Sequence, residues 1–140
     1  MTLSYLLDTN VLSELRRKAP NRHAVEWVES RPASALFLSV LTVGEIRRGI
    51  ESLAAGRRRH ALLDWVETEL PMFFAGRLLA VDLGVADRWG RLPSAAGKPL
   101  RAIDSLLAAT ALQHGLAMVT PNVRDFSAVP GLEVINPWHA

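Results

Sequence analysis

The stretch Tyr5-Leu6-Leu7-Asp8-Thr9-Asn10 decides the fold class, because a short apolar run ends abruptly in three small polar residues. Such a run is typical of a buried strand, and Asp, Thr and Asn are typical of the start of the next helix. Further apolar runs alternate with helical patterns, which indicates βαβ units around a parallel sheet. We therefore predict an α/β fold in which a twisted parallel sheet of four to five strands is flanked by helices. The predicted strands are residues 3–7, 35–38, 78–81, 117–120 and 133–135.

Three segments between these runs carry apolar residues at helical spacing. Residues 40–53 and 57–70 each place their apolar side chains on one stripe, which predicts helices that pack on the sheet. Residues 100–114 are apolar or small around most of the helix circumference, and Gly115 follows as a stop signal. This third helix is therefore predicted to be buried.

Length and composition indicate one cytoplasmic domain, residues 1–140. A chain of 140 residues with 49% hydrophobic residues can bury one sizeable core. Cysteine is absent, which excludes disulfides, thiolate metal sites and a thiol nucleophile. The sequence has neither a basic leader nor an uncharged apolar run of about 18 residues, so we expect no membrane association.

The basic residues are almost all arginine. Lys18 and Lys98 are the only lysines, so 14 of the 16 basic residues are arginine, and the net charge is +2. The planar guanidinium can bind phosphate through two hydrogen bonds and can stack on bases, so nucleic-acid contact is permitted. Charge runs of this kind are also common on solvated faces. Consecutive basic residues occur in three places in the sequence, at residues 16–18, 47–48 and 57–59.

Four acids lie where carboxylates are difficult to explain as solvated surface. Asp8 ends the first apolar run, Asp125 follows the fourth, and Glu45 and Asp104 lie in helices with broad apolar faces. The carboxyl ends of parallel strands meet at one edge of a sheet, where hard cations and phosphates are typically bound. We therefore predict that Asp8, Glu45, Asp104 and Asp125 converge there as a divalent-cation site and act as catalytic residues.

Each of these acids also has a purely structural interpretation. Asp8 is suited to cap the following helix, and Asp104 lies in a first helical turn, where an acid interacts favourably with the helix dipole. Thr42 and Glu45 have the spacing of a capping box, and Asp125 could be a solvated loop acid. Singly each acid is weak support for a metal site, whereas the four together are harder to dismiss.

Asp82 is a fifth acid that follows an apolar run, residues 78–81. No in-helix acid matches it, and we expect its strand to be an outer one. We therefore predict that Asp82 is a helix cap outside the site.

Four segments together resemble the successive motifs of PIN-domain ribonucleases, specifically the VapC and FitB-like toxins of bacterial toxin–antitoxin pairs. The match spans nearly the whole chain in order, which makes chance agreement improbable. Pro121 stands where related sequences often have arginine, and Ser105 where many have alanine. The segments are 6–14 (LLDTNVLSE), 39–50 (SVLTVGEIRRGI), 103–111 (IDSLLAATA) and 120–126 (TPNVRDF).

The resemblance implies an acidic pocket formed by the four acids and an endoribonuclease activity that depends on magnesium or manganese. Because magnesium usually takes only one or two protein carboxylates directly, we predict Asp8 and Asp104 as metal ligands, with Glu45 acting through water. The resemblance also implies a homodimer and a cognate antitoxin that covers the pocket.

Two alternatives remain at the level of sequence. One is a catalytically silent PIN-like module whose acidic pocket only binds a partner. The other is a receiver-like magnesium-binding domain, which needs paired acids after the first strand and a lysine near the last. Here Asp8 stands alone and no lysine follows Lys98, so the receiver-like alternative fits poorly.

Overall fold

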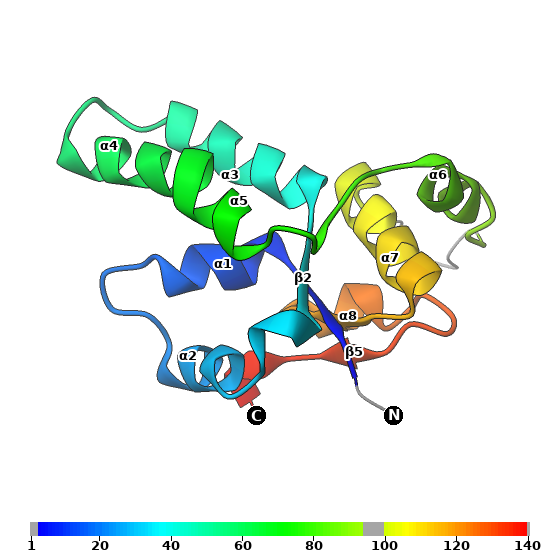
Figure 1. Ribbon diagram of the computed structural model, residues 1–140. Coiled ribbons are helices and arrows are strands. Elements are labelled where there is room, and N and C mark those ends of the chain that lie inside the picture. The colour runs from blue at the N-terminus through cyan, green and yellow to red at the C-terminus, as the bar shows by residue number, and fades with distance from the viewer. Residues whose placement is uncertain (1–2, 94–99, 140) are drawn as a thin grey trace.

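The computed structural model describes residues 3–93 and 100–139, and its centre is a five-stranded parallel sheet with helices on both faces (Figure 1). All five expected strands are present, within a few residues of their predicted bounds. Their order in the sheet is β3-β2-β1-β4-β5, and every neighbouring pair is parallel. The strands are β1 (Tyr5–Leu7), β2 (Leu36–Ser39), β3 (Leu78–Leu79), β4 (Ala117–Val119) and β5 (Val134–Ile135).

Helices occupy most of the chain between the strands. The helix predicted over 57–70 is interrupted by a π-helical turn, in which the N–H of Leu70 donates to the carbonyl of Trp65. Pro71 follows and has no N–H for a regular helical bond, which is a reason for the local widening. No helix within the described ranges is long and apolar enough to cross a membrane. The helices are α1 (Thr9–Leu15), α2 (Arg22–Glu29), η1 (Ala33–Ala35), α3 (Val40–Glu51), α4 (Arg57–Asp64), η2 (Trp65–Glu69), α5 (Leu70–Phe73), α6 (Leu83–Gly90), α7 (Ala102–His114), α8 (Val123–Phe126) and η3 (Pro137–His139).

Successive strand residues point to opposite faces of the sheet and build two cores. Leu7 and Val119 belong to the core that α1 to α5 cover, whereas Leu6 and Met118 belong to the core that α7 and α8 cover. These four side chains are essentially inaccessible to solvent. Because both faces are covered, the strands read as continuous apolar runs, as expected for a parallel sheet. The middle of α7 is buried as predicted, and α6 packs against α7.

The strand order places a topological switch point between β1 and β4, because the chain moves from β1 to β2 and β3 on one side and to β5 on the other. In open α/β sheets, ligands bind in the crevice at the carboxyl ends of such strands. The order also differs from the 2-1-3-4-5 order of receiver domains, which excludes the receiver-like alternative.

Asp82 lies away from the switch point, after the edge strand β3. Its carboxylate accepts a hydrogen bond from the N–H of Val85 at 2.9 Å and caps α6. The prediction that Asp82 is a helix cap on an outer strand is confirmed.

Candidate active site

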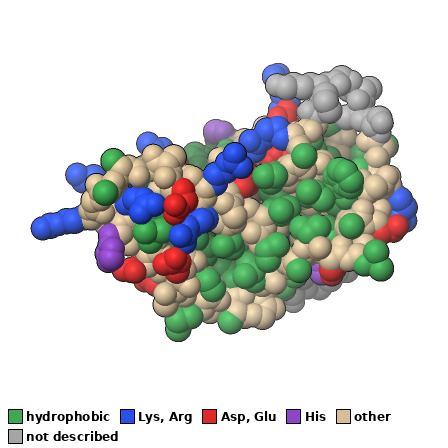
Figure 2. Space-filling view, turned by 90° about the horizontal axis from the view of Figure 1, so that it is seen from above, with side chains coloured by type: hydrophobic (Ala, Val, Ile, Leu, Met, Phe, Trp, Pro, Cys, Tyr) green, Lys and Arg blue, Asp and Glu red, His purple; other side chains and the backbone are tan. Residues whose placement is uncertain are grey.

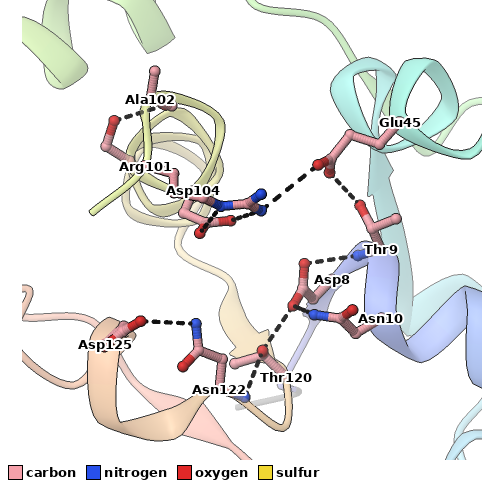
Figure 3. A network of polar contacts seen from close by, with 11 residues as sticks. Asp8, Thr9, Asn10, Glu45, Arg101, Ala102, Asp104, Thr120, Asn122 and Asp125 are labelled. Carbon is pink, nitrogen blue, oxygen red and sulfur yellow. Dashed lines mark hydrogen bonds and ion pairs between the residues drawn. The ribbon is translucent and has the colours of Figure 1, made fainter. Parts of the chain in front are cut away.

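Asp8 lies at the centre of a polar network at the carboxyl edge of the sheet (Figure 3). Its side chain is almost fully buried, at 3% exposure, and its Oδ1 accepts a 2.7 Å hydrogen bond from the N–H of Thr9. Its Oδ2 accepts hydrogen bonds from Asn10 Nδ2 at 3.1 Å and from Thr120 Oγ1 at 2.7 Å. Asp8 therefore caps α1, and in addition it ties the end of β1 to the end of β4.

The protonation of Asp8 reflects its burial. Loss of solvent raises the pKa of the Asp8 carboxyl, and hydrogen bonds from Thr120 and Asn10 oppose that shift. The negative charge of Asp104 raises the same pKa further, whereas the N–H of Thr9 lowers it. Asp8 and Asp104 therefore lie close enough to repel each other.

Asp125 is connected to this centre only indirectly. The hydroxyl of Thr120, which donates to Asp8, accepts a hydrogen bond from the N–H of Asn122 at 3.0 Å. The side-chain amide of Asn122 donates in turn to Asp125 Oδ2 at 3.2 Å. Asp125 is exposed on the short helix α8 and lies at the rim of the network.

Glu45 projects from α3 toward the same edge. The cap of α3 is Ser39, whose hydroxyl accepts from the N–H of Leu41 at 3.0 Å, so the capping-box interpretation of Glu45 is wrong. The Glu45 carboxylate instead accepts a 2.5 Å hydrogen bond from the hydroxyl of Thr9. Helix α3 is capped by Ser39, three residues before Thr42, so Glu45 lies in the second turn of the helix, facing α1.

Asp104 enters the site from the first turn of α7, with 7% of its surface exposed. Arg101 binds both of its oxygens: Nε lies 3.1 Å from Oδ2 and Nη2 lies 3.3 Å from Oδ1. The same Nη2 lies 3.8 Å from Oε2 of Glu45. The hydrogen bond to Asp104 raises the pKa of Arg101, so the guanidinium is a permanent charge among the acids.

A groove of about 170 Å³ leads away from Thr9 and Glu45 between α1, α3 and α4. Arg16, Arg58 and Trp65 line its other parts, and the Arg16 guanidinium carbon lies 5.0 Å from the centre of a Trp65 ring. None of the ion pairs formed among the described residues uses Arg16 or Arg58. Charged side chains gather at the α4 end of the molecule in Figure 2, with hydrophobic side chains across the middle of that face. The groove therefore carries unpaired positive charge beside the acids.

A family model described as PIN domain matches residues 5–132. The chain belongs to the PIN-domain family. Curated relatives of this PIN domain include Toxin FitB of Neisseria gonorrhoeae, 39% identical over 96% of this chain and 98% of the relative. VapC ribonuclease Y4jK of Sinorhizobium fredii is 38% identical over 95% of this chain and 96% of the relative.

Solved structures agree with this assignment. FitAcB from Neisseria gonorrhoeae superposes with a TM-score of 0.90 at 39% identity, covering 97% of this chain and 99% of that one. VapBC-5 from Mycobacterium tuberculosis, a member of the VapBC family of toxin-antitoxin systems, has a TM-score of 0.69 at 27% identity and covers 96% and 99%. The resemblance of this PIN domain to VapC and FitB-like toxins is therefore confirmed.

The donors at the edge of this PIN domain are carboxylate, hydroxyl and amide oxygens, which hard divalent cations prefer. Within residues 3–93 and 100–139, however, no three or more His, Asp or Glu side chains are placed to hold one ion together. Asp8 and Asp104 form a mutually repelling pair, Glu45 lies across Arg101 from Asp104, and Asp125 is set apart (Figure 3). This set fits a cation held by two carboxylates and water, rather than a cage of four acids.

The sequence did not single out Arg101. An arginine before a helix usually belongs to a solvated face, and its contact with Glu45 joins segments that are far apart in the chain. Thr120 and Asn122 lie at the end of the fourth apolar run, as Asp8 lies at the end of the first, and this position is the sequence signal that points to them.

Proposed function

We propose that this PIN domain is a metal-dependent endoribonuclease toxin that hydrolyses RNA phosphodiester bonds and is inhibited by a cognate antitoxin. The observation that carries the proposal is the placement of Asp8 and Asp104 at the switch point between β1 and β4, close enough to repel each other. Two like charges in a largely buried site are unfavourable unless a cation compensates them, and in the metal-free protein the Arg101 guanidinium does so for Asp104. The ribonuclease and toxin names of the FitB and VapC relatives supply the reaction class.

Asp8 and Asp104 are the proposed ligands of magnesium or manganese. A bound divalent cation would act as a Lewis acid on the phosphate and would make water a better nucleophile at neutral pH. The protein's contribution is to fix the carboxylates: Thr9, Asn10 and Thr120 hold Asp8 with three hydrogen bonds, and α7 holds Asp104.

Glu45 is the proposed general base. Its side chain is 20% exposed, so water can reach the carboxylate, and a hydrogen bond from the Thr9 hydroxyl orients it. That bond fixes Oε1 of Glu45, and Oε2 lies 3.8 Å from Arg101 Nη2, beyond hydrogen-bond distance, so Oε2 can accept a proton from an attacking water. Asp125, at the exposed rim, would bind water or substrate at the entrance rather than at the reacting phosphate.

RNA would enter along the groove that begins at Thr9 and Glu45. Arg58 lines this groove and forms no ion pair among the described residues, so its guanidinium is available to bind a backbone phosphate. In this proposal the groove binds RNA as an extended single strand.

The proposed partners follow from the relatives rather than from the site. VapBC-5 belongs to a toxin-antitoxin family and FitB is a toxin, so we propose a cognate antitoxin that covers the acidic edge. A homodimer of this chain is proposed only on the resemblance of its sequence to the toxin family. The proposed compartment is the cytoplasm, where RNA is accessible.

RNA cleavage by the purified protein tests the proposal. Wild type, Asp8→Ala, Asp104→Ala and Glu45→Gln should be compared on single-stranded RNA and DNA with magnesium, manganese or EDTA, with sequencing of the RNA ends produced. We expect cleavage only of RNA and only with cation. Loss of a general base typically lowers the rate by about 10² to 10⁴-fold, and Glu45→Gln should fall in this range.

Asp82→Asn is the matched control, because it removes an acid at a strand end while keeping a good helix cap. Its cleavage should equal that of wild type. Equal cleavage by wild type and Asp8→Ala would reveal a contaminating nuclease. Metal-independent binding of the antitoxin without any cleavage would favour the silent binding module instead.

A further inference from the structure

The guanidinium of Arg101 lies among the acids of the proposed metal site, between Asp104 and Glu45 (Figure 3). Two of its nitrogens contact the two oxygens of Asp104, at 3.1 and 3.3 Å. One of those nitrogens also lies 3.8 Å from Oε2 of Glu45. Such a fork on one carboxylate leaves neither Asp104 oxygen free of a positive partner.

The backbone of Arg101 is held in place, whereas its side chain is mostly in solvent. Its backbone is fixed, because its carbonyl accepts the N–H of Ser105 and begins α7. Its side chain is 73% exposed, whereas the Asp104 side chain that it binds is 10% exposed. An ion pair with one partner in solvent is weak and exchanges readily, so the guanidinium can leave Asp104 without disrupting the core.

The Arg101 guanidinium lies within the field of three acids. The hydrogen bond to Asp104 raises the pKa of Arg101, and the negative charges of Asp104, Glu45 and Asp8 raise it further. A divalent cation would satisfy the same carboxylates and would need the Asp104 oxygens that Arg101 now holds. The two cations therefore compete for one position.

We propose that Arg101 is a built-in counter-ion that holds the acidic site in the metal-free protein and must release Asp104 before a divalent cation binds there. The inference rests on the proposed metal site. When only part of the population is competent to bind, the apparent affinity falls by that fraction. Arg101 therefore weakens metal binding and stabilises the metal-free fold, two effects of opposite sign from one residue.

The test measures Mn²⁺ affinity directly, by electron paramagnetic resonance of free Mn²⁺ or by calorimetry, together with melting temperature in EDTA. We expect Arg101→Gln to bind Mn²⁺ about three- to fivefold more tightly than wild type. Arg101→Lys keeps the charge but loses the fork, so its affinity should lie between the two. In EDTA, Arg101→Gln should melt below wild type, and saturating Mn²⁺ should remove that difference.

Arg16→Gln separates direct competition from a general change in charge. It removes one positive charge from the groove that Glu45 also lines, and Arg16 makes no contact with Asp104. Arg16 is exposed and forms no ion pair with the acids of the site, so salt at about 0.15 M screens its charge, and the Mn²⁺ affinity should change by less than about twofold.

Three outcomes would overturn the inference. In the first, Arg101→Gln binds Mn²⁺ no more tightly than wild type. In the second, Arg16→Gln gains as much Mn²⁺ affinity as Arg101→Gln. If Asp104→Asn still abolishes binding in either case, the proposed metal site stands without a role for Arg101. If neither wild type nor Arg101→Gln binds Mn²⁺, the proposed metal-dependent function fails and the inference fails with it.

Discussion

Thr120 donates a 2.7 Å hydrogen bond to Oδ2 of Asp8, and this bond joins the ends of β4 and β1 across 112 residues of sequence. Both side chains are almost inaccessible to solvent. The bond lies at the switch point of the sheet, so it fixes the carboxylate where the crevice opens. Its donor is neutral and its acceptor is charged when Asp8 is ionised, which makes it stronger than an ordinary side-chain hydrogen bond.

Thr120→Val should therefore destabilise the protein by about 1.5 to 3 kcal/mol, because a buried charge loses a donor. The N–H of Asn122 also loses its acceptor. Thr110→Val is the matched control: Thr110 is equally buried, but its hydroxyl donates to the carbonyl of Leu106, within α7. Loss of that neutral bond should cost about 0.5 to 1.5 kcal/mol. Equal losses in the two variants, measured by urea denaturation, would show that the Thr120 bond has no special weight.

The stability of the metal-free protein should fall with rising pH because of Asp8. Burial raises the pKa of Asp8 above its usual value of 3.8. Between 3.8 and that raised pKa, the folded state binds more protons than the unfolded state, so stability decreases as pH rises through this window. Above the raised pKa the full penalty of the buried charge persists.

Asp8→Asn isolates this effect. In EDTA, the stability of Asp8→Asn relative to wild type should increase from pH 4 upward and then level off. Urea denaturation across pH 4 to 8 gives the difference directly. A constant offset between the two proteins would mean that the Asp8 carboxyl has the same pKa in the folded and unfolded states.

Magnesium or manganese should raise the melting temperature. At a cation concentration ten times the dissociation constant, binding to the folded state alone contributes about 1.4 kcal/mol. For a domain of this size that corresponds to a shift of roughly 5 °C. Asp104→Asn should lose most of the shift, whereas Asp82→Asn should keep it, because Asp82 caps α6 beside an edge strand. A shift of equal size in Asp104→Asn would place the cation elsewhere.

The sheet and the acids that end its strands were predictable because burial on both faces leaves continuous apolar runs, and an acid directly after such a run stands out. Asp8 was found in this way, whereas Asp104 was found by its place in the first turn of a helix that is apolar around most of its circumference. The role of Glu45 was not decided by spacing, because Ser39 and Thr42 are both suitable caps and only the end of β2 shows which one caps α3.

Other features depend on contacts that no local pattern contains. Arg101 meets Glu45 only because α7 and α3 reach the same edge of the sheet. Glu14 is buried because its carboxylate accepts the N–H of Asn21 at 2.7 Å and so holds the turn between α1 and α2. Both residues have the sequence context of ordinary surface charges, and tertiary packing alone distinguishes them.

Gly115 should be needed for stability rather than for the chemistry of the site. It ends α7 with φ 66°, in the left-handed region, immediately before the chain turns into β4. A side chain at this φ is strained, so Gly115→Ala should destabilise the protein by about 1 kcal/mol.

Gly44→Ala is the control with the opposite sign: Gly44 is an exposed residue within α3, and an added Cβ would meet no atom within 4 Å. Because alanine is the better helix former there, Gly44→Ala should stabilise by about 0.5 to 1 kcal/mol. Thermal denaturation of the two variants should therefore bracket wild type, and a stabilising Gly115→Ala would show that the turn into β4 does not require the left-handed conformation.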